Sequence, residues 1–148
     1  MIGLILAAGG GTRMKVMDTP KCLMNLGSIP IIEYQLQCFE EFGINDIVVV
    51  VGYNSKMVKE YVGKRAKFVD NLNYKTTNNL YSIWEARDSI NDDFVCVYSD
   101  LLFHKEILRR CINSKNNVCL MVEKKTKKET MRVKIEDDKI TQVNKIIP

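Results

Sequence analysis

The sequence predicts an α/β protein in which a mostly parallel sheet is covered by helices on both faces. Short β-branched runs alternate with helical patterns along most of the chain, and the links between them are short. Two of the strand-like runs, residues 46–51 and 94–98, are apolar almost throughout. Such strands are typical of parallel sheets buried on both faces, and their alternation with helices is typical of three layers.

The predicted strands lie at residues 2–6, 46–51, 66–69 and 94–98. The first predicted helix begins near Pro30, since proline is tolerated in a first helical turn. Its apolar face holds Ile32, Leu36 and Phe39 at helical spacing, and Gly43 is predicted to stop it.

Two further helices are predicted from short polar residues that are typical of helix caps. Asn54 or Ser55 is expected to begin the first of them, which Gly63 ends. Thr77 or Asn78 is expected to begin the second.

The last part of the chain predicts one more helix and then a change of pattern. Residues 103–112 are amphipathic at helical spacing. Residues 131–136 and 139–147 alternate like strands on either side of the turn Asp137-Asp138. We therefore expect a β-hairpin appended after the α/β portion.

Composition excludes several classes of protein. A chain of 148 residues with 46% hydrophobic and 27% charged residues is in the ordinary globular range, so we expect a single domain spanning 1–148. The net charge of +4 is modest, and the cations are scattered apart from a lysine run within 124–128. This pattern predicts no nucleic-acid partner.

The five cysteines and the hydropathy pattern indicate the compartment. The cysteines are odd in number and never spaced as CxxC, which is typical of a reduced, cytoplasmic protein. No apolar stretch is long enough to span a bilayer, and residues 2–8 run directly into glycines without a signal-peptide pattern. We therefore expect no membrane association.

A glycine-rich stretch follows the first predicted strand and carries the strongest functional signal. It reads Leu6-Ala7-Ala8-Gly9-Gly10-Gly11-Thr12-Arg13-Met14. Glycines at this place let backbone N–H groups approach an anion closely, at the sheet edge where ligands bind. It is not a P-loop, which has a lysine and then a hydroxyl residue after its last glycine, because Gly11 is followed by Thr12 and Arg13. Met14 stands where a dinucleotide fingerprint has its third glycine.

The residue types suit a triphosphate, which needs close backbone donors and fixed cations. Arg13 and the nearby Lys21 supply the cations, and the small Ala7 and Ala8 leave room for a flat base. A flexible turn with a solvated Arg13 is the alternative that the residues alone leave open.

Together with Pro20-Lys21, this stretch resembles the signature of nucleotidyltransferases, which join an NTP to a phosphorylated small molecule and release pyrophosphate. The family pattern is an apolar strand, AAGxGxR[ML], and then Pro-Lys. The resemblance implies a three-layer, Rossmann-like nucleotidyltransferase fold. It also implies catalytic roles for Arg13 and Lys21, and nucleotide binding by residues 6–12, namely Leu6, Ala7, Ala8, Gly9, Gly10, Gly11 and Thr12.

A second stretch narrows the resemblance within that family. Asn71-x-x-Tyr74-x-x-x-Asn78-Asn79-x-Tyr81-Ser82 resembles a segment of phosphocholine cytidylyltransferases and of related enzymes that act on aminoethylphosphonate, and residues 43–53 resemble the same enzymes. That subset uses CTP. Amides and hydroxyls can discriminate a base by its donor and acceptor pattern. We predict that Asn78, Asn79 and Ser82 bind the nucleotide, with simple helix capping as the alternative for the asparagines.

Asp100 follows the last predicted strand and is the candidate metal ligand. Its position puts a carboxylate at the sheet edge beside the predicted triphosphate, where Mg²⁺ needs an oxygen ligand. The family has a metal-binding aspartate at the matching point, although an aspartate after a strand is also a common turn former. His104 is not expected to act as a base, because a phosphate or phosphonate nucleophile is already anionic.

The predicted reaction transfers CMP from CTP, or from another NTP, to a small phosphorylated or phosphonate acceptor, with Mg²⁺ as cofactor. The resemblance spans nearly all of the chain but only the first two thirds or so of a typical family domain, whose remainder holds part of the acceptor pocket and a second metal carboxylate. Asp137, Asp138 or Glu123 is a candidate for that carboxylate, although a hairpin turn is the simpler role for the first two.

Three explanations of this difference in length are open: a piece of a longer polypeptide, which we favour, an enzyme completed by another chain, or a nucleotide-binding remnant. A sugar-1-phosphate nucleotidyltransferase and a non-catalytic nucleotide-binding module are the alternative functions. Exposed strands leave a homo-oligomer possible.

Overall fold

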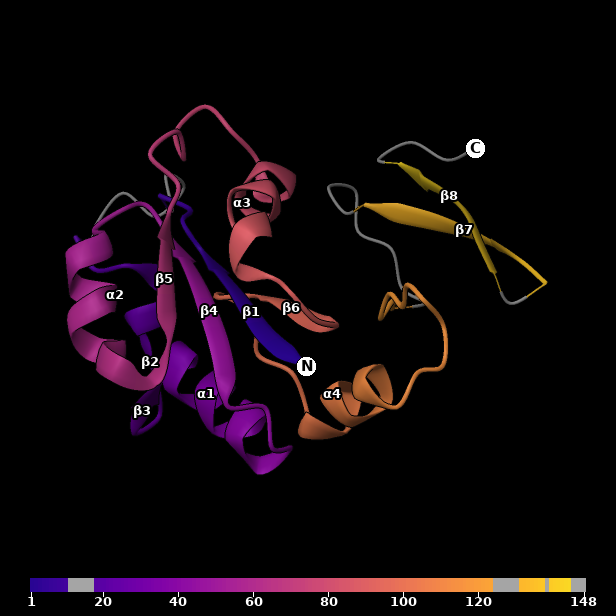
Figure 1. Cartoon of the computed structure of the whole chain (residues 1–148), viewed down its shortest axis with the longest axis horizontal. Coiled ribbons are helices and arrows are strands. Elements are labelled where there is room, and N and C mark those ends of the chain that lie inside the picture. The colour runs from indigo at the N-terminus through magenta and orange to yellow at the C-terminus, as the bar shows by residue number, and fades with distance from the viewer. Residues whose placement is uncertain (11–17, 124–130, 138, 145–148) are drawn as a thin grey trace. The chain divides into compact units, whose positions relative to one another are not determined.

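The computed structural model describes residues 1–10, 18–123, 131–137 and 139–144 (Figure 1). The predictions for Gly11, Thr12, Arg13 and Asp138, and for the lysine run within 124–128, lie outside the described residues. The chain forms two compact units, residues 1–112 and 113–148. Each is described by itself below.

The first unit is built on a parallel sheet of four strands in the order β5-β4-β1-β6, which Figure 1 shows. The strands are β1 (Ile2–Ala7), β4 (Asp46–Val51), β5 (Lys67–Asp70) and β6 (Phe94–Tyr98). All three pairings are parallel, with Leu4 opposite Val48 on one side and opposite Cys96 on the other. The predicted strands and their parallel arrangement are confirmed.

Helices cover both faces of this sheet. On one face, Ile5 of β1 packs in a cluster with residues of α1 (Ile31–Glu41), α2 (Ser55–Val62) and α4 (Lys105–Ile112). On the other face, Leu4 packs with Ala86, next to α3 (Asn79–Glu85). Because successive strand residues point to opposite faces, one strand serves both clusters. The three-layer prediction is therefore confirmed.

The helix ends follow the predicted signals with one displacement. Gly43 and Gly63 adopt positive φ angles of 73° and 60° just after α1 and α2, as helix stops do. Asn78 caps α3, since its side chain accepts a hydrogen bond from the Tyr81 N–H at 3.1 Å. Pro30, expected inside the first turn of α1, instead precedes it in a short strand.

That short strand belongs to a small antiparallel hairpin that the sequence pattern does not predict. β2 (Asn25–Leu26) pairs with β3 (Ile29–Pro30) across a turn at Gly27, whose φ is 68°. Strands of two residues are too short to show alternation. Three short 3₁₀ turns were missed as well: η1 (Lys21–Leu23), η2 (Gly63–Arg65) and η3 (Arg87–Ser89).

The second unit contains the predicted hairpin. β7 (Arg132–Glu136) pairs antiparallel with β8 (Lys139–Asn144), with an irregularity between Lys134 and Ile135. Asp137 has a left-handed backbone with φ 49°, which is typical of a hairpin turn. Asp137 therefore has the turn role expected as the simpler alternative to a metal ligand.

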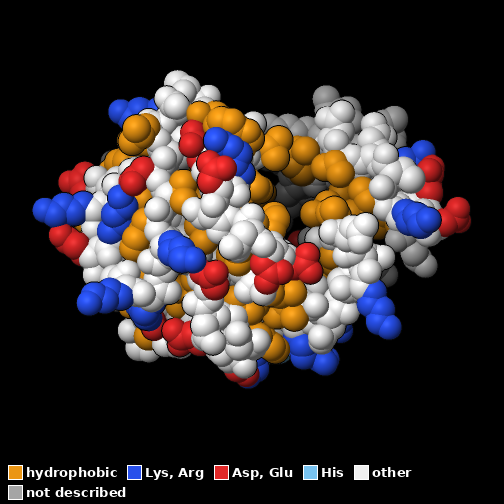
Figure 2. All heavy atoms as spheres, viewed as in Figure 1, with side chains coloured by type: hydrophobic (Ala, Val, Ile, Leu, Met, Phe, Trp, Pro, Cys, Tyr) orange, Lys and Arg blue, Asp and Glu red, His pale blue; other side chains and the backbone are white. Residues whose placement is uncertain are grey.

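The surface of the first unit mixes both signs of charge. Figure 2 shows basic and acidic side chains interspersed on the face that it displays. Several form ion pairs, including Lys59 with Asp70 at 2.7 Å and Arg65 with Glu33 at 2.9 Å. Within the described part of the chain, no helix is long and apolar enough to cross a membrane.

Candidate functional site

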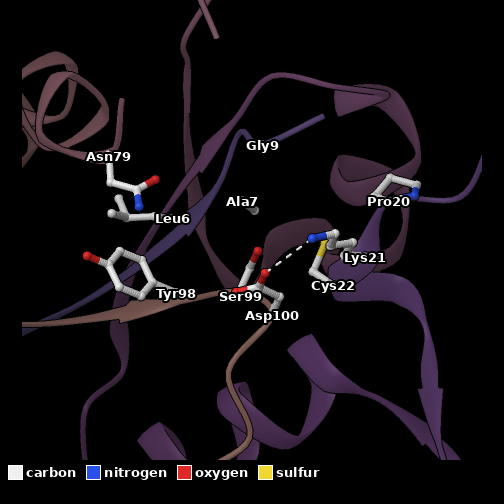
Figure 3. Close-up of a pocket in the computed structure, with 10 residues that line it drawn as sticks. All are labelled: Leu6, Ala7, Gly9, Pro20, Lys21, Cys22, Asn79, Tyr98, Ser99 and Asp100. Carbon is white, nitrogen blue, oxygen red and sulfur yellow. Dashed lines mark ion pairs between the residues drawn. The ribbon is translucent and has the colours of Figure 1, made fainter. Parts of the chain in front are cut away.

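A cavity of about 160 Å³ lies at the carboxyl ends of β1 and β6, within the first unit. It contains residues from the glycine-rich stretch, the Pro-Lys pair, the start of α3 and the end of β6. Its lining consists of Leu6, Ala7, Gly9, Pro20, Lys21, Cys22, Asn79, Tyr98, Ser99 and Asp100 (Figure 3). Segments far apart in the sequence thus meet at the sheet edge where ligands of parallel sheets bind.

One side of this cavity is charged. Figure 3 shows Lys21 and Asp100 pointing toward each other, and the Lys21 Nζ lies 3.6 Å from the Asp100 Oδ2. The Lys21 side chain is 32% exposed and that of Asp100 is 54% exposed, so both remain open to solvent or to a ligand. A cation and a carboxylate side by side suit a ligand that brings both phosphate oxygens and a divalent ion.

Strand pairing determines the position of Asp100. The Ser99 N–H donates to the Leu6 carbonyl at 3.1 Å, which continues the β1–β6 ladder one residue past β6. The chain then turns, because the Leu101 N–H donates to the Tyr98 carbonyl at 3.0 Å. Asp100 therefore lies in the turn at the carboxyl edge of the sheet, as predicted.

A 3₁₀ turn determines the position of Lys21. The Leu23 N–H donates to the Pro20 carbonyl at 2.9 Å and the Met24 N–H donates to the Lys21 carbonyl at 3.0 Å. This turn buries Cys22 and leaves Lys21 partly exposed in the cavity. Burial raises the pKa of the Cys22 thiol to about 12, so it lines the cavity as a neutral group and not as a nucleophile.

The other side of the cavity carries an amide and two larger side chains. Figure 3 shows Asn79, Leu6 and Tyr98 grouped there, away from Lys21. Asn79 is the first residue of α3, and Asn78 just before it uses its side chain to cap the helix. The capping alternative is therefore seen for Asn78, while Asn79 faces the cavity.

Ser82 lies elsewhere in the first turns of α3. It is buried, does not line the cavity, and its Oγ accepts a hydrogen bond from the Asn71 Nδ2 at 3.1 Å. The same Asn71 nitrogen donates to the Thr77 Oγ1 at 3.1 Å, and the Asn71 Oδ1 accepts from the Asn73 N–H at 3.0 Å. Asn71, which is itself buried, thus connects the 71–78 segment to α3.

The described glycines of the glycine-rich stretch have different surroundings. Gly9 lines the cavity, and a Cβ added to it would meet no atom of the described residues within 4 Å. A Cβ added to Gly10 would lie 3.6 Å from the Tyr74 ring. Ala8 is buried outside the cavity lining, and its carbonyl accepts from the Tyr53 N–H at 3.1 Å. The backbone of residues 8–10 therefore lies against Tyr53 and Tyr74, which do not line the cavity.

Four cavity residues were not among the predicted site residues: Pro20, Cys22, Tyr98 and Ser99. Each is a sequence neighbour of a predicted residue, Lys21 or Asp100, and that adjacency was the available signal. His104 makes a local hydrogen bond at the start of α4, where its Nδ1 accepts from the Glu106 N–H at 3.2 Å.

The donor set at Asp100 fits a magnesium ion that is bound mainly through substrate and water. No group of three or more His, Cys, Asp or Glu side chains is arranged for a metal among the residues that the structure describes. Mg²⁺ commonly takes one or two protein carboxylates together with waters and substrate phosphates. Asp100, exposed at the cavity, can supply such a ligand.

The sequence matches a known protein family. Residues 3–134 match the family model described as MobA-like NTP transferase domain. The chain is 31% identical over 134 residues to CTP:phosphoglutamine cytidylyltransferase from Campylobacter jejuni, covering 84% of this chain and 53% of that protein. It is 39% identical over 108 residues to choline-phosphate cytidylyltransferase from Streptococcus pneumoniae, covering 70% and 46%.

A solved structure is similar to this chain in its fold. The inositol-1-phosphate CTP transferase from T. maritima is 19% identical, with a TM-score of 0.79 over 99% of this chain and 64% of that one. The chain spans about half the length of the two curated relatives. The family match and the 31% identity over most of the chain establish that the protein belongs to the MobA-like NTP transferase domain family, in which it is similar to CTP-dependent cytidylyltransferases.

Proposed function

We propose that this chain carries the nucleotide-binding and catalytic residues of a cytidylyltransferase, which transfers CMP from CTP to a small phosphorylated or phosphonate acceptor and releases pyrophosphate. The observation that carries the proposal is the cavity where Gly9, Lys21, Asn79 and Asp100 meet. Both curated relatives above are named cytidylyltransferases, which supports CTP as the nucleotide.

The proposed reaction is a direct displacement at phosphorus. An acceptor oxygen forms a bond to the α-phosphorus of CTP, while the bond from that phosphorus to the oxygen bridging to the β-phosphorus breaks. The electron pair leaves with pyrophosphate. The acceptor oxygen is already anionic, so no side chain has to remove a proton.

The residues of this chain act by position and charge. Lys21 neutralises charge that develops on the triphosphate oxygens, and Gly9 lets the nucleotide approach the backbone closely. Arg13, which lies outside the described residues, is proposed as the second cation. Asp100 would hold Mg²⁺, which when bound neutralises triphosphate oxygens. Asn79 offers its amide on the side of the cavity away from Lys21, where we propose that the base binds.

A pyrophosphate-release assay tests this function. CTP, UTP, GTP and ATP are each combined with phosphocholine, with 2-aminoethylphosphonate and with a sugar 1-phosphate, at millimolar Mg²⁺. We expect release that is greatest with CTP and that depends on a phosphate or phosphonate acceptor. If pyrophosphate release were greatest with the sugar 1-phosphate, the acceptor class that we propose would be wrong.

The same assay separates catalysis from binding alone. Nucleotide binding measured by calorimetry, with no pyrophosphate release for any acceptor, would contradict the enzymatic role of residues 1–148. It would favour a nucleotide-binding module instead. Asp100→Asn serves as the matched control for release, since it removes the proposed metal carboxylate with little change in size.

A further inference from the structure

Gln35 is a buried carboxamide on the inner face of α1, where it has no exposed surface. Its neighbours on that helix, Ile32, Leu36 and Phe39, belong to the apolar cluster under the sheet. A carboxamide among apolar side chains is unfavourable unless its polar atoms find partners. The partners of Gln35 therefore indicate what it does.

Both partners lie beside Asp100. The Gln35 Nε2 donates to the Tyr98 carbonyl at 2.9 Å and to the Leu101 carbonyl at 2.7 Å. These two carbonyls flank the dipeptide of Ser99 and Asp100. One nitrogen thus fixes both ends of the turn that carries the proposed metal carboxylate. Two carbonyl acceptors at this nitrogen also require the amide to face them with N–H and not with oxygen.

The other half of the carboxamide is unsatisfied. The Gln35 Oε1 is buried and has no hydrogen-bond partner within the part of the chain that the structure describes. An orphan acceptor of this kind is destabilising, and an apolar side chain of similar length would avoid it. The oxygen contributes no hydrogen bond there, so what glutamine adds at this position is its two hydrogen bonds to the backbone of the Asp100 turn.

We propose that Gln35 is a positioning residue that holds the Asp100 turn rigid at the cavity. It touches neither nucleotide nor metal, and acts through the backbone on either side of Asp100. The significance of this rigidity for metal and nucleotide binding rests on the function proposed above. The rigidity itself does not, and it is measurable in the free protein.

Gln35→Met is the direct test, with Gln37→Met as the matched control. Gln37 is on the same helix but exposed, and its side-chain Nε2 donates to the Glu33 Oε1 at 3.1 Å. We expect amide hydrogen exchange at Ser99 and Leu101 to speed up about tenfold or more in Gln35→Met, by analogy with the loss of other outer-shell hydrogen bonds. The unfolding midpoint should fall modestly, because the Tyr98 and Leu101 carbonyls lose their side-chain donor, so exchange at these two amides is compared with exchange at amides of β4, which report global unfolding. Unchanged exchange at these two amides would overturn the proposal.

A measurement on the wild type keeps the proposal testable if Gln35→Met does not fold. The side-chain amide protons of Gln35 should exchange with solvent more slowly than those of Gln37, because both of its hydrogen bonds lie inside the protein. Equal exchange of the two side-chain amides would overturn the proposal.

The functional consequence is tested by calorimetry without an acceptor, so that CTP is not consumed. Gln35→Met should weaken binding of Mn²⁺ with CTP about tenfold, while binding of CTP in EDTA is unchanged. Equal weakening in EDTA would mean a general distortion and would overturn the link to Asp100. A wild type that binds no nucleotide would refute the proposed function, and the hydrogen-exchange comparison would still decide the role of Gln35.

Discussion

The ring of Tyr74 lies directly against Gly52, at a separation that leaves no room for a side chain between them. A Cβ added to Gly52 would lie 2.8 Å from both Cβ and Cγ of Tyr74 and 2.7 Å from the Ala8 carbonyl oxygen. Gly52 thus lets the chain after β4 fit between Tyr74 and Ala8, which belongs to the glycine-rich stretch. A side chain at position 52 would press on the backbone of that stretch at Ala8.

Gly52→Ala should therefore destabilise the protein and also impair nucleotide binding. Neither the Ala8 backbone nor the start of the Tyr74 side chain can move without moving its own segment, so overpacking by about 1–3 kcal/mol is expected. Urea unfolding measures this loss. Gly9→Ala is the control for stability, because its added Cβ meets nothing within 4 Å in the part of the chain that the structure describes. A loss of stability in Gly9→Ala equal to that in Gly52→Ala would contradict this explanation.

Lys21→Ala should lower kcat by about a hundredfold or more, if Lys21 stabilises the charge of the transition state. The Lys21–Asp100 pair is partly exposed and 3.6 Å long, so its loss should hardly change the free energy of unfolding. Steady-state pyrophosphate release and thermal unfolding together separate the two effects.

Lys56→Ala is the matched control for Lys21→Ala. Lys56 is an exposed lysine on α2 that pairs with Glu60 at 3.8 Å, away from the cavity residues. It should retain wild-type turnover. Full turnover in Lys21→Ala would remove Lys21 from the mechanism.

Asn71→Ala should reduce the discrimination between CTP and UTP more than it reduces binding of either. Asn71 is buried, and its side chain holds Ser82, Thr77 and the Asn73 N–H. Its removal leaves buried groups unpaired, at a cost of about 1–3 kcal/mol in stability. It also frees the segment that leads into Asn79. The ratio of kcat/KM for the two nucleotides is the measurement.

Asn73→Ala provides the comparison for Asn71→Ala. This variant keeps the backbone N–H of residue 73, which donates to the Asn71 Oδ1. It removes the long hydrogen bond from the Asn73 Nδ2 to the Tyr81 hydroxyl at 3.4 Å. The nucleotide ratio should stay at the wild-type value. If both variants changed the ratio equally, Asn71 would have no special role in this segment.

The sequence was sufficient for the layers and the main strands because burial leaves a strong pattern. Ile2 and Leu4 pack in the apolar cluster on one face of the sheet, and Ile5 packs in the cluster on the other face. Both β1 and β4 therefore have to be apolar throughout. The glycines after α1 and α2 and the Asn78 cap are local signals that do not need tertiary context. These are the features that one sequence can predict.

The support of the site could not be predicted in the same way. Gln35 lies 63 and 66 positions before Tyr98 and Leu101 in the sequence. A polar residue on an apolar helix face does not indicate which distant residue is its partner. Ser82 was predicted to contact the nucleotide from its place in a polar run, yet it is buried against Asn71. A single sequence shows which residue types are present, but not which of them face inward after folding.

The stability of the protein should fall steeply in alkali, because one buried thiol, Cys22, and one partly buried thiol, Cys96, resist ionisation. Burial raises the pKa of Cys22 to about 12 and that of Cys96 to about 11. An unfolded chain releases these protons near about pH 8.5, whereas the folded protein keeps them. Near about pH 10, between the unfolded and folded pKa values, the unfolded state therefore binds close to two fewer protons. Stability decreases with pH wherever the unfolded state binds fewer protons, here by about 2.7 kcal/mol per pH unit.

Urea unfolding at about pH 8, pH 9 and pH 10 measures this slope. Other groups, such as Tyr34, also titrate in alkali, so the slope is compared with that of the double variant Cys22→Ala/Cys96→Ala. Removing both side chains creates small cavities, but that loss is the same at every pH and does not change the slope. The double variant should therefore be less stable near neutrality and markedly less sensitive to alkali. Parallel pH profiles for the two proteins would mean that the thiols ionise freely and that neither is buried as the structure has it.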